Sequence, residues 1–320
     1  MHDDGHHGRF GGPLLVIAGP TATGKSQFAL QLARGRPIEI VGADSVQVYR
    51  GLDIGSGKVG AAEREGVPHH LIDVVEPDRP FTAGDYERCA VEAVAAIHRR
   101  GRLPLVVGGT GLYLRALLYG LSEMPSVSDA VRDGLRRELE RRGLPALRAE
   151  LELVDPDWAR RIDSNDRQRT LRGLEVYRAT GEPLSALQAR DRPTTIRYDA
   201  LVLGLDVETK ALQSAIERRV DEMLAAGLVE EVRGLLDRGF DPSLKSMQSL
   251  GYRQICEHLA GRCDLAAARS AIVREHQRYA KRQRTWFRKV SGLQWVPPAI
   301  ARIGAVVEPF LAKTRCAPQR

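Results

Sequence analysis

Three absences narrow the class of protein before any motif is considered. No apolar run approaches the roughly 18 residues that a membrane span requires. The N-terminal segment MHDDGHHGRF has neither the positively charged segment nor the apolar core of a signal peptide. The cysteines Cys89, Cys256, Cys263 and Cys316 show no C-x-x-C spacing, which argues against a zinc site or a disulfide scaffold. We therefore expect a cytoplasmic protein that does not contact a membrane.

Positive charge is unevenly distributed along the 320 residues, whose formal net charge is +7. Between Arg274 and Lys289 the sequence REHQRYAKRQRTWFRK holds seven lysines or arginines against one glutamate, with three aromatic residues interleaved. A second arginine-rich stretch runs from Arg132 to Arg172. Basic segments with interleaved aromatic residues favour a nucleic-acid backbone as partner. The alternative is a solvated helix face, which would carry more balancing acids.

The stretch GPTATGKS matches the phosphate-loop pattern G-x-x-x-x-G-K-[ST]. The apolar strand Leu14–Ala18 precedes it, and the helical pattern Gln27–Ala33 follows. A glycine-rich turn between strand and helix aims backbone N–H groups at phosphate oxygens. We expect a polyphosphate to be bound by Gly19, Pro20, Thr21, Ala22, Thr23, Gly24, Lys25 and Ser26. Lys25 would add a point charge, and the Ser26 hydroxyl a ligand for Mg²⁺.

The N-terminal part alternates short apolar strands with amphipathic helices. Strands are expected at Leu14–Ala18, Ile38–Asp44, His69–Val75 and Leu103–Gly109, with a helix over Gly84–Gly101. This rhythm predicts a P-loop NTPase-like α/β fold with a doubly wound parallel sheet. Ligands of such sheets bind at the carboxyl ends of the strands.

After about residue 121 the alternation of strands and helices stops, and it resumes near residue 199. Residues 122–198 are rich in arginine and glutamate and poor in strands, which predicts an inserted helical subdomain. Residues 13–121 and 199–298 are expected to form the catalytic core, with a returning strand at Ala200–Glu208 and long C-terminal helices. We expect residues 1–12 to be a disordered tail and residues 299–320 to be a second tail.

Acidic residues near the expected phosphate site are few. The strand Leu103–Gly109 runs into Thr110 and offers no acid of the kind that organises Mg²⁺ and water in an NTPase, which leaves Asp73 as the remaining candidate for that role. Asp44 falls at the carboxyl end of the second strand. Together with Ser45 and Gln47 it could recognise a polar heterocycle, or it could cap a helix.

The ordered motif set is similar to that of bacterial tRNA dimethylallyltransferases, also called tRNA isopentenyltransferases. The similarity covers nearly everything from Leu14 to Trp295. The motifs are GPTATGKS, DSVQVYRGLDIGSGK, HHLIDV, FTAGDY, VVGGTGLYLRALLYGL, DRQRTLRGLEVYRATG, SLGYRQI and AKRQRTWFR. One departure is DIGSGKVG, where the family commonly has alanine and then Lys-Pro or Lys-Thr after DIG-[ST]; it weakens any role for Lys58.

The resemblance implies a reaction. The dimethylallyl group would pass from dimethylallyl diphosphate to the exocyclic amine of the adenosine at tRNA position 37, immediately 3′ of the anticodon. Asp44 matches the family's base, Thr110 a threonine at the reaction channel, and Arg219 an arginine directed at the diphosphate. Mg²⁺ and Lys25 would neutralise the leaving group. The target base has to be flipped out of the anticodon arm to be reached.

The resemblance also implies where tRNA binds. The expected contacts are Asp44, Ser45, Val46, Gln47, Thr110, Arg132, Gln168, Arg169, Thr170, Leu171, Arg172, Gly251, Tyr252, Arg253, Lys281, Arg282, Arg284 and Arg288. For Arg132 and Gln168–Arg172 the alternative is a solvated arginine-rich helix. We expect a monomer.

Three other functions compete with this one. A P-loop small-molecule kinase would bind ATP in the loop and use Asp44 to activate a hydroxyl. A non-catalytic RNA-binding protein would use a nucleotide only as a switch. A relative that prenylates free adenine nucleotides is the third, although the basic C-terminal helix would then have little to contact.

Overall fold

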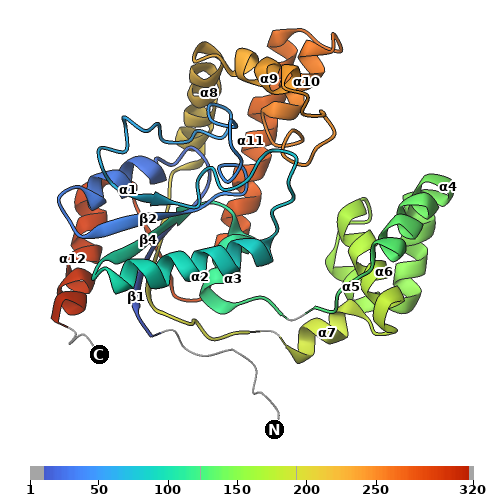
Figure 1. The fold of residues 1–320 in the computed structure, drawn as a ribbon, viewed down its shortest axis with the longest axis horizontal. Helices are drawn as coiled ribbons and strands as arrows, with labels where there is room; N and C mark the ends of the chain where they lie inside the picture. Colours follow the sequence, from blue (N-terminus) through green and yellow to red (C-terminus); the bar gives the residue numbers. More distant parts are fainter. Residues whose placement is uncertain (1–10, 123, 192, 317–320) are drawn as a thin grey trace. The chain divides into compact units, whose positions relative to one another are not determined.

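The computed structural model describes residues 11–122, 124–191 and 193–316, which form two compact units (Figure 1). The larger unit comprises Met1–Tyr119 and Ile196–Arg320, and the smaller unit comprises Gly120–Thr195. Residues 1–10 of the predicted disordered tail lie outside the described residues. No helix in the described ranges is both long and apolar enough to cross a membrane.

The larger unit is built on a parallel sheet of six strands in the order β3-β2-β4-β1-β5-β6. The strands are β1 (Pro13–Ala18), β2 (Ile38–Ala43), β3 (His69–His70), β4 (Leu103–Gly108), β5 (Asp199–Leu205) and β6 (Leu293–Val296). Every residue of β2 and β4 is buried, as expected where helices cover both faces of a parallel sheet.

Helices pack on both faces of this sheet. Along β1, Leu15 and Ile17 pack on the side of α1 (Lys25–Ala33) and α12 (Ile300–Cys316). Leu14 and Val16 point to the opposite face, because successive side chains of a strand alternate. The helices of that face are α2 (Ala83–Arg99), α3 (Gly111–Tyr119), α8 (Thr209–Ala225), α9 (Leu228–Asp237), α10 (Tyr252–Leu259) and α11 (Leu265–Phe287). Figure 1 shows α2 and α3 along one face, and α12 beside α1. The predicted doubly wound α/β fold is confirmed.

The smaller unit is helical and has its own core. Its helices are α4 (Asp129–Val154), α5 (Pro156–Arg161), α6 (Arg167–Thr180) and α7 (Leu184–Arg190). Helix α4 is broken at Gly143, whose φ of 76° is not helical, shortly before Pro145. Helices α5 and α6 begin at the capping carboxylates of Asp155 and Asp166.

Three local predictions differ from the structure. The strand expected over His69–Val75 ends at His70, because Leu71 and Asp73 have φ values of 61° and 58°, which no strand continues. Strand β6 was not predicted. The predicted tail 299–320 is wrong for α12, where Ile303, Val307 and Leu311 recur every four residues and bury one helix face.

Candidate active site

The loop after β1 has the geometry of a phosphate-binding turn. Gly19 and Gly24 have φ values of 145° and 79°, and Gly24 is the N-cap of α1. The hydroxyl of Thr23 donates to the Pro20 carbonyl over 2.9 Å and closes the turn. The loop therefore presents the N-terminus of α1, with its unpaired N–H groups and positive dipole end, to the space beyond the sheet.

A cavity of about 920 Å³ opens beside this loop at the carboxyl ends of β1, β2 and β4. It lies where the strand order reverses, because β4 is inserted between β1 and β2. The predicted site residues that line it are Thr21, Ala22, Thr23, Gly24, Lys25, Ser26, Asp44, Ser45, Val46, Gln47, Arg219 and Arg282. The structure thus brings these residues from four separate segments of the chain to one opening.

Lys25, Arg219 and Asp44 are charged residues of this cavity that act on one another. Burial lowers the pKa of Lys25 to about 7, with repulsion by Arg219 as the second cause, while Asp44 acts in the opposite direction. Burial also lowers the pKa of Arg219. The Nε of Arg219 is buried and has no hydrogen-bond partner among the described residues. Burial and mutual repulsion destabilise the charged forms of these two cations, and a bound anion would stabilise them. The cavity therefore suits a polyphosphate.

Asp44 takes part in a turn and also lines the cavity. Its Oδ1 accepts N–H bonds from Val46 over 2.8 Å and from Gln47 over 3.3 Å. The alternative considered from the sequence was that Asp44 caps a helix. One of its carboxylate oxygens does cap backbone N–H groups, but in a turn and not at a helix end. Two backbone donors fix the orientation of the carboxylate toward the cavity.

Thr110 is held beside the same turn. Its Oγ1 accepts the N–H of Ser45 over 3.0 Å, and its own N–H donates to the Ala43 carbonyl over 3.1 Å. The neighbouring glycines leave no room for side chains: a Cβ on Gly108 would lie 2.1 Å from the Ala43 oxygen, and one on Gly111 would lie 2.4 Å from the Trp286 ring. The GGTG motif is therefore a close-packing device that brings the Thr110 hydroxyl next to Ser45.

Helix α11 contributes polar residues that the sequence analysis did not assign to this cavity. Gln283 accepts the N–H of Thr21 over 2.9 Å and donates to the Gly109 carbonyl over 2.8 Å, which joins the phosphate loop to the end of β4. The Tyr279 hydroxyl interacts with Thr110 and Gln283, and burial together with Asp44 raises the pKa of Tyr279 to about 12. His276 also lines the cavity. The spacing of 276, 279 and 283 on one helix face is the signal that could have found them.

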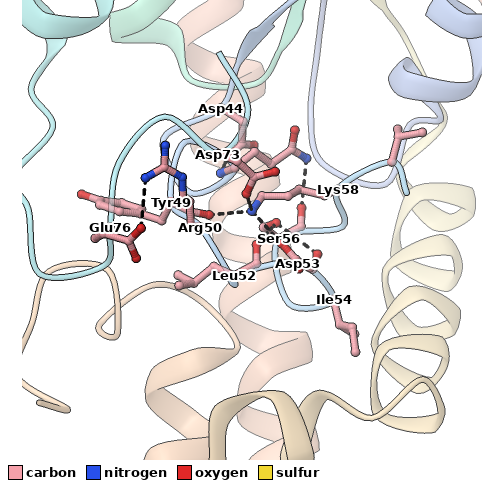
Figure 2. Close-up of polar contacts among 12 residues, drawn as sticks. Asp44, Tyr49, Arg50, Leu52, Asp53, Ile54, Ser56, Lys58, Asp73 and Glu76 are labelled. Carbon is pink, nitrogen blue, oxygen red and sulfur yellow. Dashed lines mark hydrogen bonds and ion pairs between the residues drawn. The ribbon is translucent and has the colours of Figure 1, made fainter. Parts of the chain in front are cut away.

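The acid considered for Mg²⁺ and water, Asp73, lies elsewhere. Figure 2 shows its carboxylate against Lys58, whose Nζ donates to Asp73 over 2.6 Å, to Asp53 over 2.7 Å and to the Tyr49 carbonyl over 2.5 Å. Asp73 is not among the described residues that line the cavity. The prediction for Asp73 is therefore wrong: its carboxylate anchors a buried lysine, which was given no role from the sequence.

The predicted RNA contacts of the larger unit differ in accessibility. Lys281 and Arg288 are exposed, and Arg282 lies 5.7 Å from the ring centroid of Tyr279 at the cavity. Arg284 is held by Asp206 over 2.8 Å. Tyr252 is fully buried, so its side chain cannot contact RNA in this arrangement. Its neighbours Gly251 and Arg253 begin helix α10.

The smaller unit carries the remaining predicted contacts. Gln168 and Arg169 are exposed, Arg172 pairs with Glu175 over 3.4 Å, and Arg132 pairs with Asp129 over 3.0 Å. Thr170 is fully buried and Leu171 packs against the helical core. The buried Thr170 side chain therefore cannot face RNA, which corrects that expectation, while the expected contact of the half-buried Leu171 stays a prediction.

The residues of the cavity fit a magnesium ion that binds together with a phosphate ligand. The described residues contain no group of three or more histidine, cysteine or acidic side chains that could hold a metal by itself. Mg²⁺ commonly binds through one or two protein oxygens together with phosphate oxygens and water. The Ser26 hydroxyl lines the cavity at the first turn of α1 and can serve as such a ligand.

Fold and site together define a P-loop α/β protein with an anion site at the switch point of its sheet. The model of the IPP transferase family matches residues 47–290. The chain is 50% identical over 283 residues to tRNA dimethylallyltransferase 1 of Pelobacter propionicus, covering 88% of this chain and 92% of the relative. It is 47% identical over 301 residues to tRNA dimethylallyltransferase 2 of Geotalea uraniireducens, covering 93% and 97%.

Solved structures agree with this relationship. The tRNA isopentenylpyrophosphate transferase of Bacillus halodurans is similar with a TM-score of 0.69 and 36% identity, over 95% of this chain and 98% of that one. A eukaryotic dimethylallyltransferase acting on tRNA is similar with a TM-score of 0.80 and 28% identity, over 94% and 80%. The chain belongs to the IPP transferase family. The predicted family and the predicted class of enzyme, tRNA dimethylallyltransferase, are confirmed.

Proposed function

We propose that this protein transfers the dimethylallyl group of dimethylallyl diphosphate to the exocyclic amine of the adenosine at tRNA position 37, giving N6-dimethylallyladenosine. The observation that carries the proposal is the arrangement of Lys25 and Arg219 in one cavity with Asp44. A site with two cations for a leaving group and one oriented carboxylate for an acceptor suits a substitution in which diphosphate departs from carbon.

The diphosphate is held by the phosphate loop. Backbone N–H groups at the start of α1, the Lys25 ammonium and the Arg219 guanidinium take up the charge that develops as the carbon–oxygen bond breaks. Binding of the anion also favours the protonated form of Lys25, whose pKa is low in the free site. The Ser26 hydroxyl, together with the diphosphate, would hold Mg²⁺, which would supply further charge neutralisation.

The acceptor amine loses its proton to Asp44. The amine of adenine is weakly nucleophilic, and a bond from its nitrogen to the allylic carbon makes its proton acidic. Because Oδ1 of Asp44 is held by the N–H groups of Val46 and Gln47, the other carboxylate oxygen is the one that takes this proton. The Thr110 hydroxyl, fixed against Ser45, lies beside this corner and orients the acceptor.

The adenosine reaches the cavity flipped out of the anticodon arm. Arg282 and Tyr279 at the cavity offer a guanidinium and an aromatic ring for the extruded nucleotide. Further RNA contacts are proposed at Lys281, Arg288 and the Gly251–Arg253 backbone of the larger unit, and at Arg132, Gln168, Arg169 and Arg172 of the smaller unit.

One competition assay tests the proposal against its rivals. The protein is incubated with Mg²⁺, labelled dimethylallyl diphosphate, an unmodified anticodon stem–loop, ATP and AMP. We expect label on the RNA and on neither nucleotide. Label on AMP would support a free-nucleotide prenyltransferase, and phosphate transfer from ATP would support a kinase. Nucleotide-dependent RNA binding without any product would support a switch protein.

A further inference from the structure

Residues Asp53–Lys58 form a loop, here called the carbonyl loop, that faces the cavity with two backbone oxygens. The Ser56 carbonyl accepts from Nη2 of Arg219 over 3.3 Å and from Nε2 of Gln47 over 3.2 Å. The Gly57 carbonyl accepts from the same Gln47 nitrogen over 3.2 Å. A Cβ on Gly57 would lie 2.1 Å from Nη2 of Arg219, so the guanidinium packs directly on this backbone. The position of the carbonyl loop therefore sets the position of Arg219.

The opposite side of the carbonyl loop is held by a single carboxylate. Glu231, on α9, accepts the backbone N–H groups of Asp53, Ile54 and Gly55 over 3.1, 2.7 and 3.2 Å. Its Oε1 also accepts the hydroxyl of Tyr252 over 2.7 Å. In the described part of the chain these neutral donors are its hydrogen-bond partners. Three successive amides bound to one charged acceptor are strong bonds that fix the path of the backbone.

Tyr252 contacts both Glu231 and the carbonyl loop. A Cβ on Gly55 would lie 2.6 Å from the Tyr252 ring, so loop and ring are in close contact. The ring is fully buried, and its hydroxyl satisfies the Glu231 oxygen that also binds Gly55. The buried tyrosine of the SLGYRQI motif thus acts on the cavity through Glu231.

The far end of the carbonyl loop is anchored by Lys58. Its side chain is only 4% exposed, and Figure 2 shows its ammonium between Asp53, Asp73 and the Tyr49 carbonyl. These bonds tie the end of the loop to its own beginning and to the segment after β3. Because both ends of the loop are fixed, a shift of Glu231 would move the carbonyls of Ser56 and Gly57.

We infer that Glu231 is a positioning residue that holds Arg219 in place through the carbonyl loop, with Tyr252 as its partner. The inference rests on the proposed role of Arg219 toward the diphosphate. Loss of the Glu231 charge weakens three amide bonds at once, and a displacement of about 1 Å at a substrate-binding group can lower rates by about 10²-fold. The larger effect is expected on use of dimethylallyl diphosphate, because the exposed basic residues proposed to bind RNA, Lys281 and Arg288, lie at α11 and not on this loop.

The first test compares Glu231→Gln with Glu230→Gln. Glu230 is the neighbour on α9, is 69% exposed, and pairs across one helix turn with Arg233, which makes it a matched control. We expect Glu231→Gln to lower kcat/KM for dimethylallyl diphosphate by about 10- to 100-fold. The Kd for the stem–loop should stay within about twofold, and Glu230→Gln should resemble the wild type. Unchanged kcat/KM in a folded Glu231→Gln variant would overturn the inference.

The second test asks whether Glu231 acts through Arg219. In an Arg219→Gln background, Glu231→Gln should cause little further loss, because the group that it positions is already gone. Additive losses would overturn the inference, since a merely structural role lowers activity in either background. If Arg219→Gln leaves kcat/KM for dimethylallyl diphosphate unchanged, the proposed role of Arg219 fails, and this inference fails with it.

Tyr252→Phe provides a third test, which can be used if Glu231→Gln does not fold. It removes one hydrogen bond and keeps the ring under Gly55. We expect a smaller loss of kcat/KM for dimethylallyl diphosphate, about 3- to 10-fold, which disappears in the Arg219→Gln background. A wild-type value for Tyr252→Phe would contradict the inference.

Discussion

Lys25 shows at the scale of one residue how this site is prepared for an anion. Its pKa lies at about 7 in the free site, because burial disfavours the ammonium and Arg219 repels it. The lysine is charged below this pH and neutral above it. A bound diphosphate restores the charge, so the free site and the complex differ in protonation.

The first prediction follows from this pKa. As pH rises through about 7, Lys25 of the free enzyme loses its proton, and kcat/KM for dimethylallyl diphosphate should fall. The pH profile of kcat should fall only at higher pH, because the complex holds the proton more tightly. Lys25→Arg keeps a guanidinium charged at all these pH values and should lose this alkaline fall, whatever its absolute rate. The same alkaline fall in both proteins would assign it to another group.

Asp44 is the residue on which proton transfer depends. Asp44→Asn keeps the size of the side chain and its acceptor oxygen toward Val46 and Gln47, but cannot take a proton. We expect single-turnover prenyl transfer to slow by about 10²- to 10⁴-fold, with RNA affinity much less affected. Equal losses of affinity and rate would make Asp44 a residue that only positions the RNA.

At the scale of elements, the site depends on how closely β4 approaches β2. The end of β4 is glycine because the Ala43 carbonyl occupies the space of a side chain, and this approach places Thr110 beside Ser45. Gln283 of α11 then bridges the phosphate loop to Gly109. Strand ends and one helix face are thus joined by a few hydrogen bonds.

A glycine substitution tests this packing. In Gly108→Ala the new methyl group would lie 2.1 Å from the Ala43 oxygen, which is backbone and cannot move aside at low cost. We expect the free energy of unfolding to fall by about 1 to 3 kcal/mol in chemical denaturation. Gly234→Ala on α9 has open space and is the control, with a gain of about 0.5 to 1 kcal/mol. Equal stability of the two variants would contradict the packing described for β4.

What the sequence could predict depended on how local the signal was. The phosphate loop, the strands β1, β2, β4 and β5 and the amphipathic α2 are marked by neighbouring residues, and their positions were predicted closely. Gln283 and Glu231 were missed because each acts on a segment far away in the chain, which no local pattern records. Lys58 was missed although its partners Tyr49, Asp53 and Asp73 are near it in the chain, because no sequence pattern marks which carboxylates a lysine meets. Helix α12 was missed although its apolar spacing of four residues was present.

At the scale of the whole molecule, positive charge near the cavity prepares it for a polyanionic partner. Arg284, included among the predicted RNA contacts, is committed to Asp206, whereas Arg288 at the end of α11 is exposed. The exposed arginine is the one expected to meet a phosphate, since neutralising a phosphate releases counterions.

Salt dependence measures this contribution. We expect Arg288→Gln to weaken stem–loop binding and to reduce the slope of log K against log salt by about 0.7 to 0.9, the value for one phosphate contact. Affinity for dimethylallyl diphosphate should not change. Arg233→Gln, on α9 and paired with Glu230, is the control and should leave the slope unaltered. An unaltered slope for Arg288→Gln would remove this residue from the RNA surface.

The central claim is that diphosphate leaves from carbon, and the fate of one oxygen atom tests it most directly. Dimethylallyl diphosphate carrying a heavy oxygen between carbon and phosphorus is turned over with the stem–loop, and both products are analysed by mass spectrometry. The account predicts that the released diphosphate retains the heavy oxygen while the RNA gains one C5H8 unit. Heavy oxygen that stays on carbon, in dimethylallyl alcohol with a diphosphorylated acceptor or in dimethylallyl monophosphate with a phosphorylated acceptor, and no prenylated RNA, would contradict it.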